Sequence, residues 1–435
     1  MSHPDPIAFI HECNWSDLPA DAQVMTRLNL LDLTAIAAAA QTTRLTELIA
    51  AHAAHQFAGV QPMLFDPRSA SAAGVALAAG MRIDSLDGHD GFNPAKGHIG
   101  CPLLPALLAL APADLSGGAF LTALAMGYEF GARASVAQHA TAPDYHTSGS
   151  WGAVTAAAAG ARLLKLDSQQ TRHALGIAEY HGPRSQMMRC IDHPTMVKDG
   201  SGWGAMAGVS AALLAQSGFT GAPSLITEQA QDHWGDLGAR WYVSEQYYKP
   251  WPVCRWVQGP VEALLALRSA HGVAASDVAS IEIETFHEAV RLATASPKTT
   301  EEAQYSTSFP CALALVHGDI RPEHLRDEAL QESETLRLSQ ATVMREHAHA
   351  NAYFPQQRFA RVSLGLRNGA RLKTDWIEPR WGPQNPPRAA DLEAKYRAYA
   401  TPILGPARAE AIETTIATLE TRPYADLGQL LMAPT

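Results

Sequence analysis

Acidic and basic side chains gather in one short segment of an otherwise apolar region, residues 84–98. The segment reads Asp-Ser-Leu-Asp-Gly-His-Asp-Gly-Phe-Asn-Pro-Ala-Lys-Gly-His, with three aspartates, two histidines and one lysine. Apolar, helix-like runs flank it at 70–81 and 101–111. Because an unpaired buried charge is costly, these groups must be solvated or paired with one another. A segment that holds both acids and bases can move protons, so we look for an active site here.

Two further segments place polar groups before a helix. Residues 144–152 put His146, hydroxyls and backbone N–H groups at the start of an Ala-rich run, where an anion can bind. The alternative is a simple helix cap with an exposed histidine. Lys198 precedes a Gly- and Ala-rich helix, where it can neutralise a substrate carboxylate, although a surface lysine is the simpler interpretation.

Aromatic residues and prolines surround Lys249 and Arg255 in the segment 247–256, Tyr-Tyr-Lys-Pro-Trp-Pro-Val-Cys-Arg-Trp. Aromatic walls with two cations would make a stiff cationic pocket wall, and the same segment would also serve as a connector between domains. The segment 301–309 is weaker evidence, because it could be only a cap before a helix at 310–316.

Composition excludes several classes of protein. The 435 residues are 47% hydrophobic and only 17% charged, so we expect much buried surface in domain contacts or an oligomer interface. A net charge of −10 argues against nucleic-acid binding. Five widely spaced cysteines indicate reduced cytoplasmic thiols. No run has the pattern of a signal peptide or membrane span.

Familiar catalytic and metal-binding motifs are also missing. The chain has no Walker A sequence, no GxGxxG after a strand, no HExxH and no GxSxG. The spacing of Asp87, His89, Asp90 and His98 fits no standard metal site, so we predict no metal.

The hydrophobic pattern predicts two kinds of architecture along the chain. Residues 25–270 are rich in helix-forming Ala and Leu, with helices expected at 28–40, 43–55, 118–134, 151–164, 168–179 and 202–216. Alternation at 278–286 predicts a strand, and 360–374 predicts a β-hairpin with an Asn-Gly turn. Helix-like stretches at 301–316 and 322–331 lie between them, and 391–431 is helical again. We therefore predict a mainly α protein with an α+β second domain: an all-helical domain at 1–271 and 386–435, and an inserted α+β domain at 272–385.

These segments together resemble the MmgE/PrpD family, which contains 2-methylcitrate dehydratase, cis-aconitate decarboxylase and an iminodisuccinate epimerase. The resemblance covers roughly residues 25–425. The matching segments are Ser-Leu-Asp-Gly-His-Asp at 85–90 with Gly-His at 97–98, His-Thr-Ser-Gly-Ser-Trp-Gly at 146–152, Met-Val-Lys at 196–198, Ser-Gly-Phe-Thr-Gly at 217–221, Lys-Pro-Trp-Pro-Val-Cys at 249–254 and Gln-Tyr-Ser-Thr-Ser-Phe at 304–309. It implies a large helical domain with a smaller α+β domain, a homodimer, and a cofactor-free pocket between the two domains.

Carried over residue by residue, the resemblance implies a set of site residues. The catalytic candidates are Asp87, His98, His146, Lys198 and Lys249. Besides this carried-over set, we expect substrate contacts from the neighbouring residues His89, Asp90, Lys96, Arg255, Tyr305 and Phe309.

The chain departs from the family pattern at three places. Phe309 stands where the family usually has Tyr, and Gln258 where it often has His. His89, Asp90 and Gly91 stand where Asp-Asp is often followed by Thr or Ser. These departures point to a different substrate or reaction, or to lost chemistry.

The resemblance implies small polycarboxylate substrates and a carbanion formed beside a carboxylate. Lys198 and Lys249 would stabilise the enolate, and His98 or His146 would take the proton, with Asp87 orienting a histidine or acting as the base. Our leading hypothesis is a cytoplasmic, cofactor-independent hydro-lyase acting on a hydroxy-polycarboxylate. An epimerase or isomerase, a decarboxylase and a non-catalytic carboxylate-binding paralogue remain open.

Overall fold

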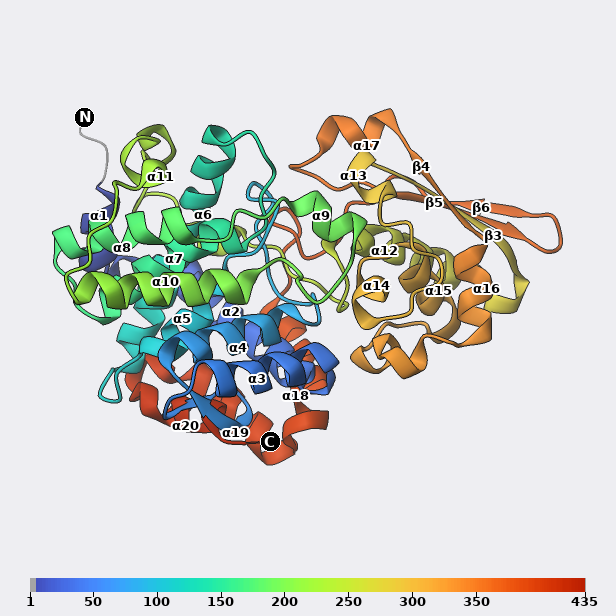
Figure 1. Ribbon diagram of the computed structural model, residues 1–435. Coiled ribbons are helices and arrows are strands. Elements are labelled where there is room, and N and C mark those ends of the chain that lie inside the picture. The colour runs from blue at the N-terminus through green and yellow to red at the C-terminus, as the bar shows by residue number, and fades with distance from the viewer. Residues whose placement is uncertain (1–4, 435) are drawn as a thin grey trace.

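The computed structural model describes residues 5–434 and contains a large helical part beside a smaller part built on a sheet (Figure 1). Eleven α-helices lie between residues 5 and 228: α1 (Pro6–Glu12), α2 (Ala20–Ala39), α3 (Arg44–Gln56), α4 (Ala72–Asp84), α5 (Gly100–Leu110), α6 (Gly117–Thr141), α7 (Gly149–Leu163), α8 (Ser168–His181), α9 (Met187–Asp192), α10 (Ser201–Gln216) and α11 (Leu225–Glu228). The helices predicted from the Ala- and Leu-rich runs are all present. A short hairpin, β1 (Gln61–Met63) and β2 (Asp66–Ala70), was not predicted.

Side chains at the helix starts explain several of these boundaries. Ser71 caps α4 by accepting a hydrogen bond from the backbone N–H of Gly74. Asp167 and Gln170 form a reciprocal capping box at α8. The start of α10 follows Gly200, which has a left-handed backbone with φ of 68°.

Glycines let α10 pack closely against α7 and α4. A Cβ atom on Gly204 would lie 2.4 Å from the carbonyl oxygen of Gly149, and one on Gly202 would lie 2.5 Å from that of Leu77. The backbones therefore touch where a larger side chain would keep them apart. This close packing brings the end of α4 and the starts of α7 and α10 to one place, which the candidate site occupies.

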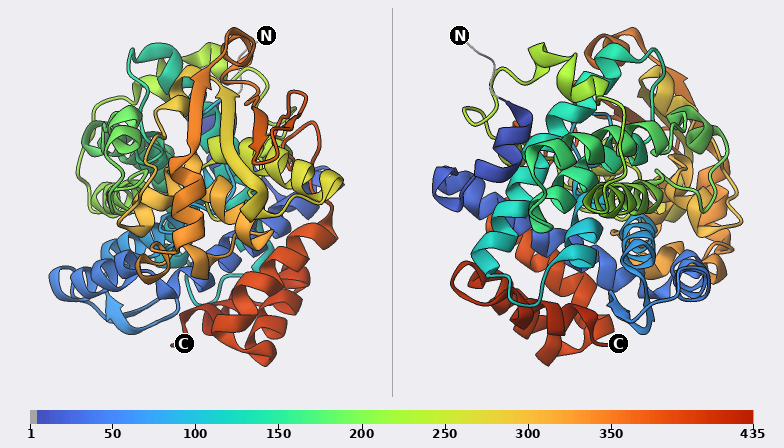
Figure 2. Two further views of the ribbon diagram at one scale, coloured as in Figure 1. Left: turned by 90° about the vertical axis from the view of Figure 1, so that its right-hand side faces the viewer. Right: turned by 60° about the vertical axis from the view of Figure 1, so that its left-hand side comes forward.

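The last three helices return to the helical part. They are α18 (Ala389–Leu404), α19 (Pro406–Ala417) and α20 (Tyr424–Met432), and α18 packs along α2. A buried ion pair joins these two helices, with Lys395 Nζ 2.6 Å from Asp32 Oδ1. Figure 2 shows these helices, in red, beside the blue N-terminal helices. Among residues 5–434, no helix has the length and apolar character needed to cross a membrane.

The smaller part is built on a four-stranded sheet in the order β4-β3-β5-β6. The strands are β3 (Val278–Thr285), β4 (Thr342–Glu346), β5 (Arg361–Leu366) and β6 (Arg371–Lys373). β3 pairs parallel to β4 and antiparallel to β5, and β5 pairs antiparallel to β6. The strand predicted at 278–286 and the hairpin at 360–374 are confirmed, with Gly369 at a positive φ of 87° in the turn.

Helices around this sheet complete the smaller part. They are α12 (Arg255–His271), α13 (His287–Val290), α14 (Thr300–Gln304), α15 (Ser308–His317), α16 (Ser333–Gln340) and α17 (Ala348–Tyr353). The predicted helical stretch at 301–316 is interrupted at 305–307. The prediction of a helix at 322–331 was wrong, because only two short 3₁₀ turns form there.

Two hydrophobic cores underlie the two parts. The first joins the N-terminal helices with α18–α20, and the second joins the sheet with α12 and α15. Met187, Cys190 and Ile191 of α9 pack into the second core, although α9 lies within the N-terminal half of the chain. The predicted fold class is confirmed. The predicted boundaries, 1–271 with 386–435 and 272–385, remain a prediction.

Candidate active site

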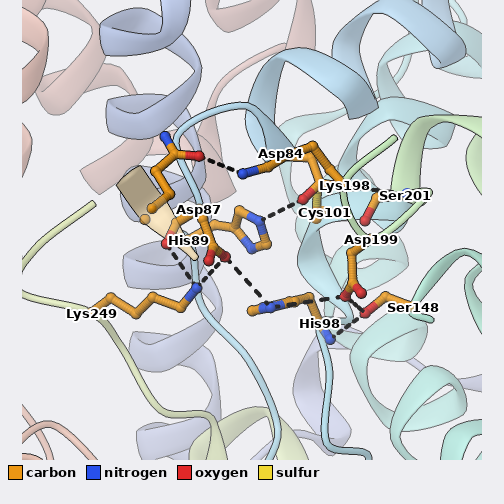
Figure 3. Close-up of polar contacts among 12 residues, drawn as sticks. Asp84, Asp87, His89, His98, Cys101, Ser148, Lys198, Asp199, Ser201 and Lys249 are labelled. Atoms are coloured by element: carbon orange, nitrogen blue, oxygen red, sulfur yellow. Dashed lines mark hydrogen bonds and ion pairs between the residues drawn. The ribbon is translucent and has the colours of Figure 1, made fainter. Parts of the chain in front are cut away.

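The acidic and basic segment predicted from the sequence forms a buried loop between α4 and α5 (Figure 3). Its backbone pairs with a second segment: Gly91 N–H donates to the Tyr247 carbonyl at 3.0 Å, and Tyr247 N–H donates back at 2.7 Å. This pairing fixes the chain just before Lys249 beside the loop. Asp87 and Lys249, more than 150 residues apart in sequence, therefore meet in one buried cluster of side chains, which we call the centre.

Asp87 and Lys249 form a buried ion pair at that centre. Lys249 Nζ lies 2.5 Å from Asp87 Oδ1 and 2.7 Å from the Asp87 carbonyl oxygen. Asp87 has a left-handed backbone with φ of 49°, a strained conformation that tends to occur at functional sites. Burial raises the pKa of Asp87, but the ammonium groups of Lys249 and Lys198 outweigh burial and lower that pKa below its ordinary value. Asp87 is therefore a carboxylate at neutral pH.

His98 presents one unprotonated ring nitrogen to the same centre. Its Nδ1 lies 2.5 Å from the Asp90 carbonyl oxygen, which only accepts hydrogen bonds, so Nδ1 carries the proton. Nε2 lies 4.0 Å from Asp87 Oδ1 and 4.0 Å from Asp199 Oδ2. Burial, the neighbouring His89 and Lys249 lower the pKa of His98 well below its ordinary value. The imidazole is therefore neutral at pH 7, with its Nε2 lone pair free to accept a proton.

Lys198 joins the centre to the smaller part of the molecule. Its backbone is also left-handed, with φ of 50°, and its side chain is almost completely buried. Lys198 Nζ donates to Gln304 Oε1 and lies 4.6 Å from the centre of the Tyr305 ring. Gln304 in turn donates to the Ser85 carbonyl oxygen at 3.0 Å. Hydrogen bonds through Lys198 and Gln304 therefore connect the helical part with the smaller part of the molecule.

Asp199 belongs to the centre but was not among the predicted site residues. Ser148 Oγ accepts a hydrogen bond from His98 N–H at 2.9 Å and donates one to Asp199 Oδ2. Burial and the nearby Asp84 carboxylate raise the pKa of Asp199 to about 7. The only signal in the sequence was its position directly after Lys198. Its approach to His98 depends on the packing of α4, α7 and α10, which no local pattern shows.

His89 and Asp90 lie behind the centre. His89 Nε2 is 3.6 Å from Asp84 Oδ1, and its ring meets the ring of His98 edge-on with centres 4.2 Å apart. The carboxylate of Asp90 accepts a hydrogen bond from the Tyr128 hydroxyl at 2.7 Å. Burial raises the pKa of Asp90 to about 6. These two predicted substrate-binding residues are therefore completely buried in the described structure and hold the loop in place.

A metal ion would have close ligand atoms but an unfavourable charge environment. Atoms of Asp87, His89 and His98 lie within 4.8 Å of one another, a carboxylate–imidazole set that suits a transition metal. The ammonium group of Lys249 already binds Asp87 and would repel a cation. We therefore assign no metal to this cluster.

Other predicted residues are not joined to the centre by any side-chain hydrogen bond or ion pair within residues 5–434. His146 Nδ1 lies 2.7 Å from the Asp144 carbonyl oxygen. Lys96 Nζ lies 4.2 Å from the centre of the Tyr145 ring. Arg255 donates to the backbone carbonyls of the segments at 248 and 379–380. Phe309 packs in the second core. Their predicted roles in binding and catalysis remain predictions.

A pocket of about 270 Å³ adjoins the centre. Lys198 and Gly200 line it on one side, and Thr147, Arg189 and His193 line it on others. Three of these residues are basic, so the pocket suits an anionic ligand. A larger pocket of about 810 Å³ lies between α18 and the segment 319–326. His98 and Asp87 line neither pocket, and Lys198 is the residue of the centre that lines the smaller one.

Two buried lysines beside a neutral histidine are typical of an acid–base centre in an enzyme. The model of the MmgE/PrpD N-terminal domain matches residues 7–239, and that of the MmgE/PrpD C-terminal domain matches residues 251–421. The chain belongs to the MmgE/PrpD family. It is similar to the cis-aconitate decarboxylase-like protein oryM of Aspergillus oryzae, with 23% identity over 478 aligned positions, an alignment that covers 96% of this chain and 95% of the relative.

Proposed function

We propose that this protein is a lyase that removes water from a small hydroxy-polycarboxylate without a metal or an organic cofactor. The observation that carries the proposal is a neutral imidazole, His98, set beside two buried ammonium groups, Lys198 and Lys249. Membership of a family of dehydratases and decarboxylases supports the reaction class. The name of the Aspergillus relative supports a polycarboxylate substrate.

His98 is the proposed base. Its Nε2 would take the proton from the carbon beside a substrate carboxylate, while Nδ1 keeps its hydrogen bond to the Asp90 carbonyl. A positioned general base typically contributes about 10²–10⁴-fold to the rate. The carboxylate of Asp87, 4.0 Å from Nε2, would stabilise the imidazolium that forms.

The lysines are the proposed stabilisers of the enolate. Removing the proton spreads a second negative charge over the substrate carboxylate, and fixed cations in a buried site stabilise this charge more strongly than water does. Lys198 is the better placed of the two, because it also lines the pocket. Lys249 already neutralises Asp87, so its contribution is to the positive electrostatic potential of the site.

Arg189 and His193 would bind a further substrate carboxylate at the outer side of the pocket. Both are solvent-exposed, unlike Lys198, so one end of the ligand would face basic groups near solvent and the other a buried ammonium. This arrangement favours an acid with two or more carboxylates over a monoacid.

Proton NMR in deuterated water, with a panel of citrate-like and aspartate-like acids, tests the proposal. We expect deuterium exchange at the carbon beside a carboxylate together with alkene formation, and His98→Ala should reduce both by at least about a hundredfold. Exchange with inversion alone would show an epimerase. Saturable binding without exchange would show a non-catalytic paralogue.

Decarboxylation is the second candidate, favoured by the name of the Aspergillus relative. It would use the same stabilised carbanion, formed by loss of carbon dioxide instead of a proton. Release of carbon dioxide without loss of water from any acid in the panel would replace the dehydratase proposal with this one.

A further inference from the structure

Removal of water needs a proton for the departing hydroxyl as well as a base for the carbon. We infer that Asp199 donates this proton and afterwards recovers one from His98. The inference rests on the proposed dehydratase function and adds the general acid that the proposal lacks.

The position of Asp199 fits this role. Its chain neighbours on both sides, Lys198 and Gly200, line the pocket beside the centre, while the carboxyl group itself is buried. Ser148 fixes Oδ2 by donating a hydrogen bond to it. Oδ1 is buried and has no hydrogen-bond partner among the described residues, so it is the oxygen on which a transferable proton can sit.

Asp199 differs from its neighbouring carboxyl groups, Asp84 and Asp87, because no lysine, arginine or backbone N–H of the described residues donates to its carboxyl group. Lys249 holds Asp87, while His89 and the Ser201 N–H face Asp84. Burial raises the pKa of Asp84, but its neighbours outweigh burial and lower that pKa, as they do for Asp87. Groups whose environments drive their pKa values apart mark the acid and the bases of a site.

Burial and two neighbouring carboxylates favour the protonated form of Asp199. The charged or titratable neighbours are Asp84, Asp87, His89, His98 and Lys198, with Tyr145 beyond them. The two carboxylates raise the pKa of Asp199, and the His89 imidazole lowers it only in part. Burial keeps the thiols of Cys101 and Cys190 and the phenols of Tyr145 and Tyr305 protonated.

His98 and Asp199 together account for both protons that move in this reaction. His98 Nε2 takes the carbon-bound proton, and the C–H electron pair forms the new C=C bond. The C–O bond breaks with its electron pair on oxygen, and that oxygen takes the proton of Asp199 to leave as water. An imidazolium and a carboxylate remain, with Nε2 and Oδ2 4.0 Å apart. Return of the proton from Nε2 to Oδ1 through one water restores both groups.

Asp199→Asn tests the inference, because it keeps the shape and the hydrogen bond from Ser148 but has no acidic proton. We expect alkene formation to fall by at least about a hundredfold. Deuterium exchange of an analogue lacking the hydroxyl needs only the base, so its rate should stay within about tenfold of the wild-type rate. Asp232→Asn, which changes an exposed aspartate, is the matched control and should leave both rates unchanged.

The pH profile gives a second measurement. Wild-type alkene formation should decline as pH rises through about 7, because Asp199 then loses its proton. The residual activity of Asp199→Asn should not show this decline. If Asp199→Asn keeps elimination within about threefold, or loses exchange and elimination equally, the inference fails while the proposed function stands. If the wild type neither exchanges nor eliminates with any acid, the proposed function itself fails.

Discussion

Replacing Lys249 with methionine should destabilise the fold through Asp87. The variant keeps a side chain of similar length but removes the ammonium that lies 2.5 Å from Asp87 Oδ1. Lys249 is completely buried and Asp87 is 2% exposed, so water cannot replace the lost cation without a rearrangement. Removing one partner of a buried ion pair costs about 3–5 kcal/mol. At about 2 °C per kcal/mol for a large domain, the melting temperature should fall by roughly 6 °C or more.

The double variant Asp87→Asn/Lys249→Met separates this charge effect from lost packing. With no charge left to neutralise, most of the lost stability should return, giving a coupling free energy of about 2 kcal/mol or more between the two positions. Activity should not return, because the centre has lost both groups. Arg388→Met, at an exposed pair with Asp391, is the control and should leave the melting temperature unchanged.

The pH dependence of Lys249→Met gives an independent check. In the wild type the pKa of Asp87 is lowered, so its stabilising contribution is present above the unfolded pKa and is lost as pH falls through the folded value. In the variant, burial dominates and raises that pKa, so protonation on acidification should stabilise the fold. The difference in unfolding free energy between the wild type and Lys249→Met should therefore become smaller as pH falls. Additive losses in the double variant, or a deficit independent of pH, would refute the reasoning.

Three further outcomes are expected. Lys198→Ala should lower turnover by at least about a hundredfold through loss of enolate stabilisation, and near-normal turnover in the NMR assay would remove Lys198 from the site. Chelators should leave the rate unchanged, and a loss restored by a divalent ion would instead support a metal at Asp87 and the histidines. Gly204→Ala should destabilise the fold by about 1–3 kcal/mol because its Cβ would lie 2.4 Å from the Gly149 carbonyl oxygen, and an unchanged melting curve would contradict the close packing of α7 and α10.

Local patterns were sufficient to predict most of the elements of the fold. The alternation at 278–286 and the Asn-Gly turn at 368–369 gave β3 and the β5–β6 hairpin, because strand period and turn chemistry are local properties. The prediction of a helix at 322–331 failed because this highly charged stretch forms two short 3₁₀ turns instead, with Leu325 and Leu330 buried in the second core. The parallel pairing of β4 with β3 was not predicted, because parallel neighbours are joined by a long crossover and leave no turn signal.

Site residues that lie close together in one segment of the sequence could be predicted. Site residues that only helix packing brings together could not. Asp87 and His98 share a loop rich in acids and bases, and the resemblance added the lysines. Asp199 was not predicted as a site residue because an aspartate after a lysine in a loop is ordinarily solvated. It becomes part of the centre only when glycines bring α10 against α7, so that Ser148 bridges it to His98.

The same packing explains why one carboxyl group of the centre can hold a proton while its neighbours cannot. Lys249 pairs with Asp87 and His89 faces Asp84, but the ring beside Asp199 is the neutral imidazole of His98. No lysine or arginine within residues 5–434 forms an ion pair with Asp199. A basic group there would have to displace Ser148 or the backbone of α7. The glycines that shape the fold therefore also determine where the site keeps its acid.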